Sequence, residues 1–301
     1  MIYAIGETVM DILFKEDKPI DAVPGGSAFN SVISIGRVGV PCAFIGYTGK
    51  DHVGDLTVDF LKANSVDVRY FEQKDNVKSC ISLAFLDERG DAHYVFYKDT
   101  PVSNSLLDRK LEFQAGDALL LGSYYAVSAG TRSQIKGVLD AAVAAGVTVY
   151  YDLNFRSSHK DELPELMPAI LDNFRRATVV RGSADDFEVM WGERDARKIY
   201  KEHIARYCRI FICTSGAGRI TVCTPDDAWD FDVQQVADVV STVGAGDNFN
   251  AGFLCALSRR QMSLAGSIEK VDMAPLIESG VRFASAVCRS TENYVPVSFK
   301  M

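Results

Sequence analysis

The chain has 301 residues, of which 48% are hydrophobic and 24% charged, a composition typical of a globular protein with a sizeable core. Its net charge of −8 argues against nucleic acid as the main partner, although a nucleotide would need only a local anion site. No apolar run approaches the roughly 18 residues of a membrane span. No basic leader precedes the first strand-like segment, so we expect neither a secretory signal nor a membrane partner.

The 7 cysteines and 4 histidines are scattered along the chain. No two cysteines form a C-x-x-C pair, and the histidines show no metal-ligand spacing. An odd number of isolated cysteines in a chain of this length indicates reduced thiols, which predicts a cytoplasmic protein.

The first segment, residues 2–7, is predicted to be a buried strand that ends at a glycine. Residues 9–14 then place a single carboxylate, Asp11, among apolar side chains. Because a buried and unpaired carboxylate is costly, Asp11 requires hydrogen-bond donors nearby. A turn or a cap would supply them, and so would the hydroxyl groups of a bound sugar.

A glycine pair, Gly25-Gly26, precedes an apolar pattern at helical spacing that Gly39 ends. Asn30 falls on the first turn of this predicted helix, close to the amides of the glycine pair. Backbone amides and a carboxamide together form a neutral set of donors and acceptors that suits a polyol. A glycine pair by itself is more often a simple turn.

Residues 66–100 read as strands with no helix between them: 66–71, 79–87 and 92–98, with a hairpin turn at 87–91. Such a block predicts a small sheet beside the main domain, and we expect residues 11–22 to join it as an inserted lid. Strand alternation places Phe96 and Lys98 on the same face. They form either an ordinary lid core with a solvated lysine or an apolar and a cationic group that approach a sugar together.

After Pro101 strands and helices alternate, which predicts one α/β domain over 1–301 with a mainly parallel sheet covered by helices on both faces. The predicted strands are 117–122, 147–152, 177–181, 209–214 and 219–223. The predicted helices are 129–145, 161–174, 184–191, 195–207, 248–260 and 271–288. Ligands bind at the carboxyl ends of such strands. The candidate residues expected there are Asp152, Asn154, Arg156, Thr214, Gly216 and 244–247.

The stretch 239–254 joins a short β-branched run, Val239-Val240, to the turn Gly244-Ala245-Gly246 and a helical pattern. Glycines at a helix start let unpaired N–H groups converge on one point, where the helix dipole favours a phosphate. A carboxylate at Asp247 would repel that phosphate unless it takes a proton there. The simpler interpretation is that Asp247 caps a buried helix.

Residues 242–247, followed by Phe249 and 251–254, resemble the second signature of the phosphofructokinase B, or ribokinase-like, family of carbohydrate kinases. The glycine pair with Asn30, followed by residues 46–55, resembles the first signature of that family. The resemblance covers essentially the whole chain. It implies a ribokinase-like three-layer α/β/α fold with a β lid, and phosphorylation of a sugar hydroxyl by ATP with Mg²⁺.

The resemblance also implies a role for each matching residue. Asp247 would be the catalytic base, and the amides of Gly244, Ala245 and Gly246 would form an anion hole. The residues implied in acceptor binding are Asp11, Gly25, Gly26, Asn30, Phe96, Lys98, Asn154 and Arg156. Those implied in nucleotide binding are Ser183, Thr214, Gly216, Thr242, Gly244 and Gly246. Asp186 would organise water around Mg²⁺ where many relatives carry a glutamate.

Some positions depart from the family pattern. Ser241 replaces the aspartate that supports a monovalent-cation site, so we expect little activation by K⁺. The segments that contain Asp11 and Phe96 favour fructose as acceptor, giving fructose 6-phosphate. Ribose, 2-keto-3-deoxygluconate or a nucleoside are alternatives, and a weakly catalytic sugar or nucleotide sensor is an alternative of a different class. The lid of this family also suggests a homodimer.

Overall fold

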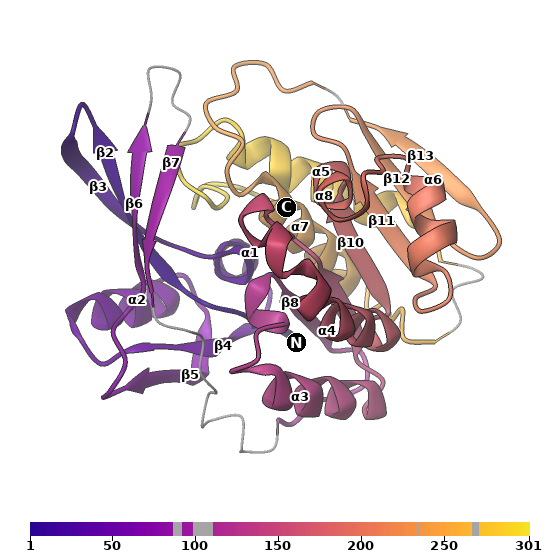
Figure 1. Ribbon diagram of the computed structural model, residues 1–301, viewed down its shortest axis with the longest axis horizontal. Coiled ribbons are helices and arrows are strands. Elements are labelled where there is room, and N and C mark those ends of the chain that lie inside the picture. The colour runs from indigo at the N-terminus through magenta and orange to yellow at the C-terminus, as the bar shows by residue number, and fades with distance from the viewer. Residues whose placement is uncertain (87–91, 99–110, 234, 267–270) are drawn as a thin grey trace.

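The computed structural model describes residues 1–86, 92–98, 111–233, 235–266 and 271–301. Within them the chain forms a nine-stranded sheet with helices on both faces and a separate four-stranded sheet (Figure 1). This arrangement confirms the predicted three-layer domain with an inserted small sheet. Among the described residues, no helix combines the length and the apolar character that crossing a membrane requires.

The large sheet has the order β13-β12-β11-β10-β9-β8-β1-β4-β5. Its strands are β1 (Ile2–Ile5), β4 (Cys42–Gly49), β5 (Asp67–Lys74), β8 (Ala118–Gly122), β9 (Thr148–Asp152), β10 (Val179–Ser183), β11 (Ile210–Thr214), β12 (Arg219–Cys223) and β13 (Ala228–Asp232). Neighbours from β5 to β11 are parallel, whereas β12 and β13 are antiparallel. The central strands are continuous apolar runs because both of their faces are covered. Their carboxyl ends therefore meet at one edge of the sheet.

Two hydrophobic cores lie on opposite faces of the large sheet. Along β1, Ile2 and Ala4 join one core and Tyr3 and Ile5 join the other, as strand alternation requires. The helices of the first core are α1 (Ser27–Arg37), α2 (His52–Ala63), α7 (Ala245–Arg259) and α8 (Ala274–Val287). Those of the second are α3 (Arg132–Ala144), α4 (Leu163–Arg176), α5 (Ala184–Trp191) and α6 (Ala196–Ile199). Short helical turns occupy Tyr124–Ala126, Ser157–Glu162 and Tyr200–Ile204.

The small sheet has the order β3-β2-β6-β7 and stands to the left of α1 in Figure 1. Its strands are β2 (Val9–Lys15), β3 (Lys18–Gly25), β6 (Ile81–Leu86) and β7 (Ala92–Tyr97). The two hairpins come from separate parts of the sequence and join through parallel pairing of β2 with β6. The last residue of β3, Gly25, is followed at once by the N-cap of α1, so the small sheet leads directly into the first core. The predicted hairpin turn at 87–91 lies outside the described residues.

The structure differs from the sequence predictions at four places. Residues 66–71 do not belong to the small sheet, because β5 pairs with β4 and packs Phe71 on Phe44 in the first core. Residues 195–207 are not one α-helix, since α6 ends at Ile199 and a wider π-helical turn follows. The last strand, β13, was not predicted. The expectation that 244–247 lie at the carboxyl end of a strand is also wrong, because the β-branched run Val239-Val240 forms no strand.

Val239 and Val240 are both more than half exposed and lie outside any described strand. The Val240 N–H instead donates to the Cys288 carbonyl at the end of α8, at 2.8 Å. β-branched residues favour a pleated and half-buried surface, but here no neighbouring strand offers one. The glycine turn that follows therefore does not continue directly from a strand of the sheet.

Candidate active site

The N-terminus of α7 is built on Gly244, its N-cap, which has a φ of 77° in the left-handed region. A side chain there would also be crowded, because a Cβ would lie 2.8 Å from the backbone oxygen of Asn293. The preceding turn is closed by the Ala245 N–H, which donates to the Thr242 carbonyl at 3.2 Å. The first amides of a helix have no partner within the helix, so this end offers donors to an anion.

Asp247 lies in the first turn of α7 and is 9% exposed. The Ser27 hydroxyl donates to its Oδ1 at 2.7 Å, and the Asn30 amide donates to its Oδ2 at 2.9 Å. The Ser31 hydroxyl donates to the Asp247 backbone oxygen at 2.8 Å. All three donors belong to α1. The capping interpretation of Asp247 is therefore wrong, since Gly244 is the cap and the carboxylate is held by another helix.

Burial raises the pKa of Asp247, and the hydrogen bonds from Ser27 and Asn30 oppose this effect. Among charged groups, Asp152 adds to the rise and Arg156 opposes it. A carboxylate whose pKa is raised is a stronger base than a solvated one and remains suited to accept a proton. The electrostatics therefore fit the proton-accepting role that the sequence suggested.

A second group of polar atoms surrounds Gly25, and we call Asp11, Gly25, Asn30 and Asn293 the acceptor cradle. A Cβ on Gly25 would lie 2.9 Å from Asp11 Oδ2, 3.8 Å from Asn30 Oδ1 and 3.8 Å from Asn293 Nδ2. Any side chain at this position would fill the space between these atoms. Asp11 of β2 and Asn30 of α1, both expected from sequence to bind the acceptor, are thus brought together around Gly25.

Asp11 and Asn30 are both buried, yet each keeps an oxygen available. The Ser82 hydroxyl of β6 donates to Asp11 Oδ1, which leaves Oδ2 facing the cradle. Burial raises the pKa of Asp11, and the bond from Ser82 opposes this. Asn30 Oδ1 is buried without a hydrogen-bond partner. Unsatisfied buried oxygens are rare, and a ligand hydroxyl is one way to satisfy them.

On the other side of α7, Arg181 of β10 joins several candidate residues. Its Nη1 lies 3.0 Å from Asp152 Oδ1, and its Nη2 donates to Thr214 Oγ1 at 2.7 Å. A Cβ on Gly246 would lie 3.0 Å from the guanidinium, so the positive charge packs directly beneath the glycine turn. Asn250 of α7 completes the network by donating to Asp152 Oδ2 at 2.7 Å.

Ser183 and Asp186, the residues expected near Mg²⁺, form the N-terminal cap of α5. The Ser183 hydroxyl accepts from the Asp186 N–H at 3.1 Å, and Asp186 Oδ2 accepts from the Ser183 N–H at 2.7 Å. This is a capping box. Among the described residues, no three His, Cys, Asp or Glu side chains are grouped closely enough to hold a metal.

The remaining predicted residues occupy loops at the carboxyl ends of strands. Asn154, after β9, has a φ of 40°, a left-handed conformation that asparagine tolerates better than most residues. Arg156 is exposed, and its charge opposes the rise in the pKa of Asp247. Gly216, with a φ of 50°, makes the turn from β11 to β12.

Phe96 and Lys98 lie together, as alternation predicted, with Lys98 Nζ 5.6 Å from the Phe96 ring centroid. Lys98 also forms an ion pair with Glu7 at 3.3 Å and lies 5.7 Å from the Tyr124 ring. Phe96 is 53% exposed, so it is not an ordinary buried core residue of the small sheet.

Sequence reasoning missed several residues that contact the predicted ones, among them Ser27, Arg181 and Asn293. Arg181 could have been noticed, because a charged residue inside a buried strand needs a partner in the fold. Ser27 and Asn293 gave no such signal. Their importance follows from contacts with residues that are far away in the sequence.

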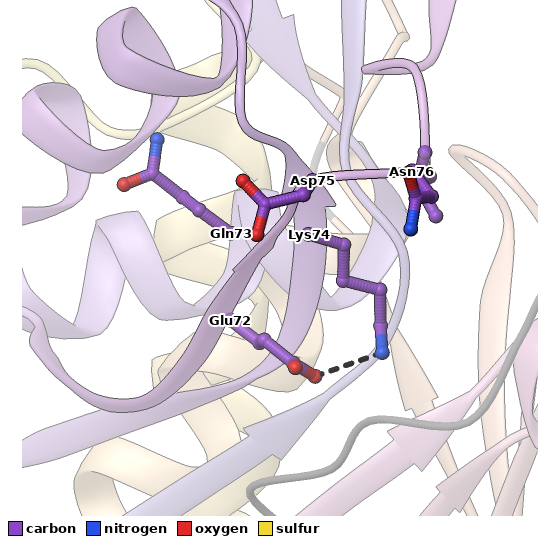
Figure 2. Close-up of a pocket in the computed structure, with 6 residues that line it drawn as sticks. Glu72, Gln73, Lys74, Asp75 and Asn76 are labelled. Atoms are coloured by element: carbon purple, nitrogen blue, oxygen red, sulfur yellow. Dashed lines mark ion pairs between the residues drawn. The ribbon is translucent and has the colours of Figure 1, made fainter.

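A hollow of about 360 Å³ lies elsewhere, at the carboxyl end of β5 (Figure 2). It is lined by the consecutive residues 72–77. Glu72 pairs with Lys74 at 3.0 Å, and Asp75 pairs with Lys50 at 2.9 Å. Because these charges are paired and the lining residues belong to one segment, the hollow lacks the convergent groups found between α1 and α7.

The chain is similar to known proteins along most of its length. The family model described as pfkB family carbohydrate kinase matches residues 1–298. A fructokinase from Rhizobium leguminosarum bv. trifolii is 25% identical over 279 residues, covering 90% of this chain and 84% of the relative. An aminoimidazole riboside kinase from Salmonella typhimurium is 28% identical over 273 residues, covering 86% and 81%. A crystal structure of fructokinase from Vibrio cholerae O395, bound to fructose, ADP and calcium, superposes with a TM-score of 0.83 at 21% identity, covering 98% and 95%.

Proposed function

Because the chain belongs to the pfkB family of carbohydrate kinases, and is therefore a phosphotransferase that acts on a sugar hydroxyl, we propose that it uses ATP and that fructose is its acceptor. The product would be fructose 6-phosphate. The observation that carries this proposal is the position of Asp247, a buried carboxylate one residue beyond the glycine turn and bonded to the helix that carries Asn30.

In the proposed mechanism the cradle holds the sugar through Asp11 and Asn30, and Asp247 accepts the proton of the attacking hydroxyl. Each oxygen of Asp247 accepts one hydrogen bond from α1 and keeps a further lone pair for that proton. The phosphoryl group passes through a loose transition state with charge on its equatorial oxygens. Free amides at the start of α7 would donate to this charge, and one such donor is worth roughly 10²–10³ in rate.

Mg²⁺ would reach the site with ATP, neutralise phosphate charge, and have Asp186 near its water shell. Thr214, Gly216 and Thr242 would contact the nucleotide. Arg181 keeps Thr214 and the glycine turn in register, because its guanidinium touches both.

Fructose is favoured by the fructokinase relatives, and fructose is also bound in the V. cholerae structure. The aminoimidazole riboside kinase relative keeps a nucleoside-like acceptor open, together with ribose and 2-keto-3-deoxygluconate. The test is release of ADP from ATP in a coupled assay over a panel of these acceptors, with Asp247→Asn as the matched control. Turnover of another acceptor without turnover of fructose would overturn the choice of fructose.

The alternative of a weakly catalytic sensor is favoured by one observation, the engagement of Asp186 in the cap of α5. Sugar and ATP that both bind while no acceptor is turned over would support the sensor. A wild-type rate far above that of the Asp247→Asn control would exclude it.

Two further proposals concern the cellular compartment of the enzyme and its oligomeric state. All 7 cysteines are free, which suits a reducing cytoplasm. On β7, an edge strand of the small sheet, Phe96 and Tyr97 are 53% and 57% exposed, which favours a homodimer through this sheet. The mass measured by light scattering at several concentrations tests the dimer, and a monomer at every concentration would contradict it.

A further inference from the structure

Asn293 connects the two halves of the candidate site. Its backbone oxygen accepts from the Asn248 side chain of α7 at 2.8 Å and would lie 2.8 Å from a Cβ on Gly244. Its side-chain Nδ2 points the other way and would lie 3.8 Å from a Cβ on Gly25. Asn293 therefore lies against the turn at the start of α7 through its backbone and contributes its side chain to the acceptor cradle.

The segment around Asn293 is firmly docked on α1. Arg37 Nη1 bonds to Glu292 Oε2 at 2.6 Å and to the Val295 carbonyl at 2.8 Å. The Tyr294 ring is 1% exposed, and its hydroxyl donates to the Pro24 carbonyl next to the cradle. Since the residues on both sides are anchored, the Asn293 amide is held in place before a ligand arrives. A preorganised group loses little entropy when it binds.

The cradle presents open acceptor oxygens, and the side-chain amide of Asn293 can supply a hydrogen-bond donor beside them. One N–H of the Asn30 amide donates to Asp247, and the Ser82 hydroxyl donates to Asp11. The two oxygens that remain open, Asp11 Oδ2 and Asn30 Oδ1, accept hydrogen bonds when Asp11 is ionised. A sugar hydroxyl donates one hydrogen bond and also accepts. The side-chain amide of Asn293 has no partner among the described residues, so it is available to donate.

We infer that Asn293 binds the acceptor: its amide donates to a hydroxyl oxygen of a neutral polyol, whose hydroxyl groups donate hydrogen bonds to Asp11 Oδ2 and Asn30 Oδ1. The inference rests on the proposed function, since it assigns a third side chain to the acceptor site of that kinase. It also defines the substrate class, because adjacent hydroxyls of a polyol can satisfy two acceptors and one donor together.

The test compares Asn293→Ala and Asn293→Asp with the wild-type enzyme, using the best acceptor of the panel. The readouts are the KM for sugar, the KM for ATP, and the sugar Kd from calorimetry, which does not require turnover. Asn293→Ala should raise the sugar Kd and KM about threefold to tenfold, as expected for one neutral hydrogen bond. Asn293→Asp should raise them further, because it replaces the donor by a charge that repels Asp11. The KM for ATP should stay within about twofold in both variants.

Glu292→Gln is the matched control, since it weakens the ion pair of the same segment with Arg37 and leaves the amide of Asn293 in place. We expect it to lower Tm without a comparable change in sugar affinity. An unchanged sugar Kd in Asn293→Ala, or an equal loss in Glu292→Gln, would overturn the inference while wild-type turnover still supports the kinase. If the wild-type chain binds sugar without turnover and Asn293→Ala binds it more weakly, the proposed kinase activity is overturned and the inference about Asn293 stands. A wild-type chain that binds no acceptor would overturn both.

Discussion

The two sides of the candidate site differ in how far their buried polar groups have hydrogen-bond partners within the protein. In the acceptor cradle, Asn30 Oδ1 is buried without a partner and Asp11 Oδ2 lies beside Gly25. On the proposed nucleotide side, Arg181 is bound to Asp152 and Thr214, although its Nε is buried without a partner. The first side therefore presents open acceptor oxygens, whereas most hydrogen bonds of the second side are made within the fold. Substitutions in the cradle should therefore appear in acceptor binding, and substitutions around Arg181 should appear first in stability.

Asp247 lies at the boundary between the two sides, and its loss should have the largest effect. Asp247→Asn removes the proton acceptor but preserves size and most contacts with α1, so we expect kcat to fall by roughly 10²–10⁴. ATP affinity and Tm report on the fold in the same preparation. Retention of more than about a tenth of the wild-type kcat would remove Asp247 from the role of base.

Arg181→Met tests the nucleotide side by leaving Asp152 as a buried charge without its partner. Removing one partner of a buried ion pair costs about 3–5 kcal/mol, so the free energy of unfolding in urea should fall by that order. Arg209→Met is the control, because Arg209 is exposed at the start of β11 and should change stability by less than about 0.5 kcal/mol. Similar losses of unfolding free energy in the two variants would show that the buried ion pair of Arg181 contributes no more to stability than an exposed arginine does.

Asp11→Ala tests the cradle and should leave stability nearly intact. Hydrogen bonds to a charged group are worth roughly 1.5–3 kcal/mol, so kcat/KM for the sugar should fall about 10- to 150-fold. The KM for ATP should move little, since the nucleotide is held on the other side. A lower Tm with an unchanged sugar KM would instead make Asp11 a structural residue.

A smaller effect is expected for the pH dependence of folding stability that Asp247 causes. Burial raises the pKa of Asp247 above its ordinary value of 3.8, so the folded state holds that proton more tightly than the unfolded state. Stability therefore falls as pH rises from about 3.8 through the raised pKa. Each unit by which the pKa rises corresponds to about 1.4 kcal/mol at neutral pH. Asp247→Asn should be more stable than wild type at neutral pH and should lose this advantage in acid; a constant difference across pH would contradict the reasoning.

The smallest expected effect is that of potassium. The Ser241 hydroxyl accepts from the Val243 N–H at 3.1 Å, so it serves a local turn and brings no negative charge. We expect nearly equal rates in K⁺ and Na⁺ at matched ionic strength. A several-fold rise specific to K⁺ would mean that carbonyl groups or other carboxylates form the cation site.

The parts of the fold that depend on local patterns could be predicted from sequence. The alternation of strands and helices after Pro101 and the glycine turn before Asp247 depend on neighbouring residues, and the structure agrees with them. The pairing of β5 with β4 could not be predicted in this way, since the strand-like pattern of 66–71 does not tell which sheet it joins.

The same difference separates the site residues that were predicted from those that were missed. Asp11, Asn30 and Asp247 stand out because a polar residue in an apolar or glycine-rich setting requires an explanation. Asn293 lies in a polar segment, where an asparagine needs none. Its role follows from contacts with Gly25 and Gly244, and no local pattern encodes those contacts.

Long sequence separation also has a consequence for how the molecule folds. The contacts that assemble the site join Ser27 to Asp247 across 220 residues and Tyr294 to Pro24 across 270. Contacts between distant segments are slow to form, because closing a long loop costs entropy before the contact stabilises it. We therefore expect the acceptor cradle to be among the last parts of the chain to assemble during refolding. Recovery of sugar binding should then lag behind recovery of helical circular dichroism.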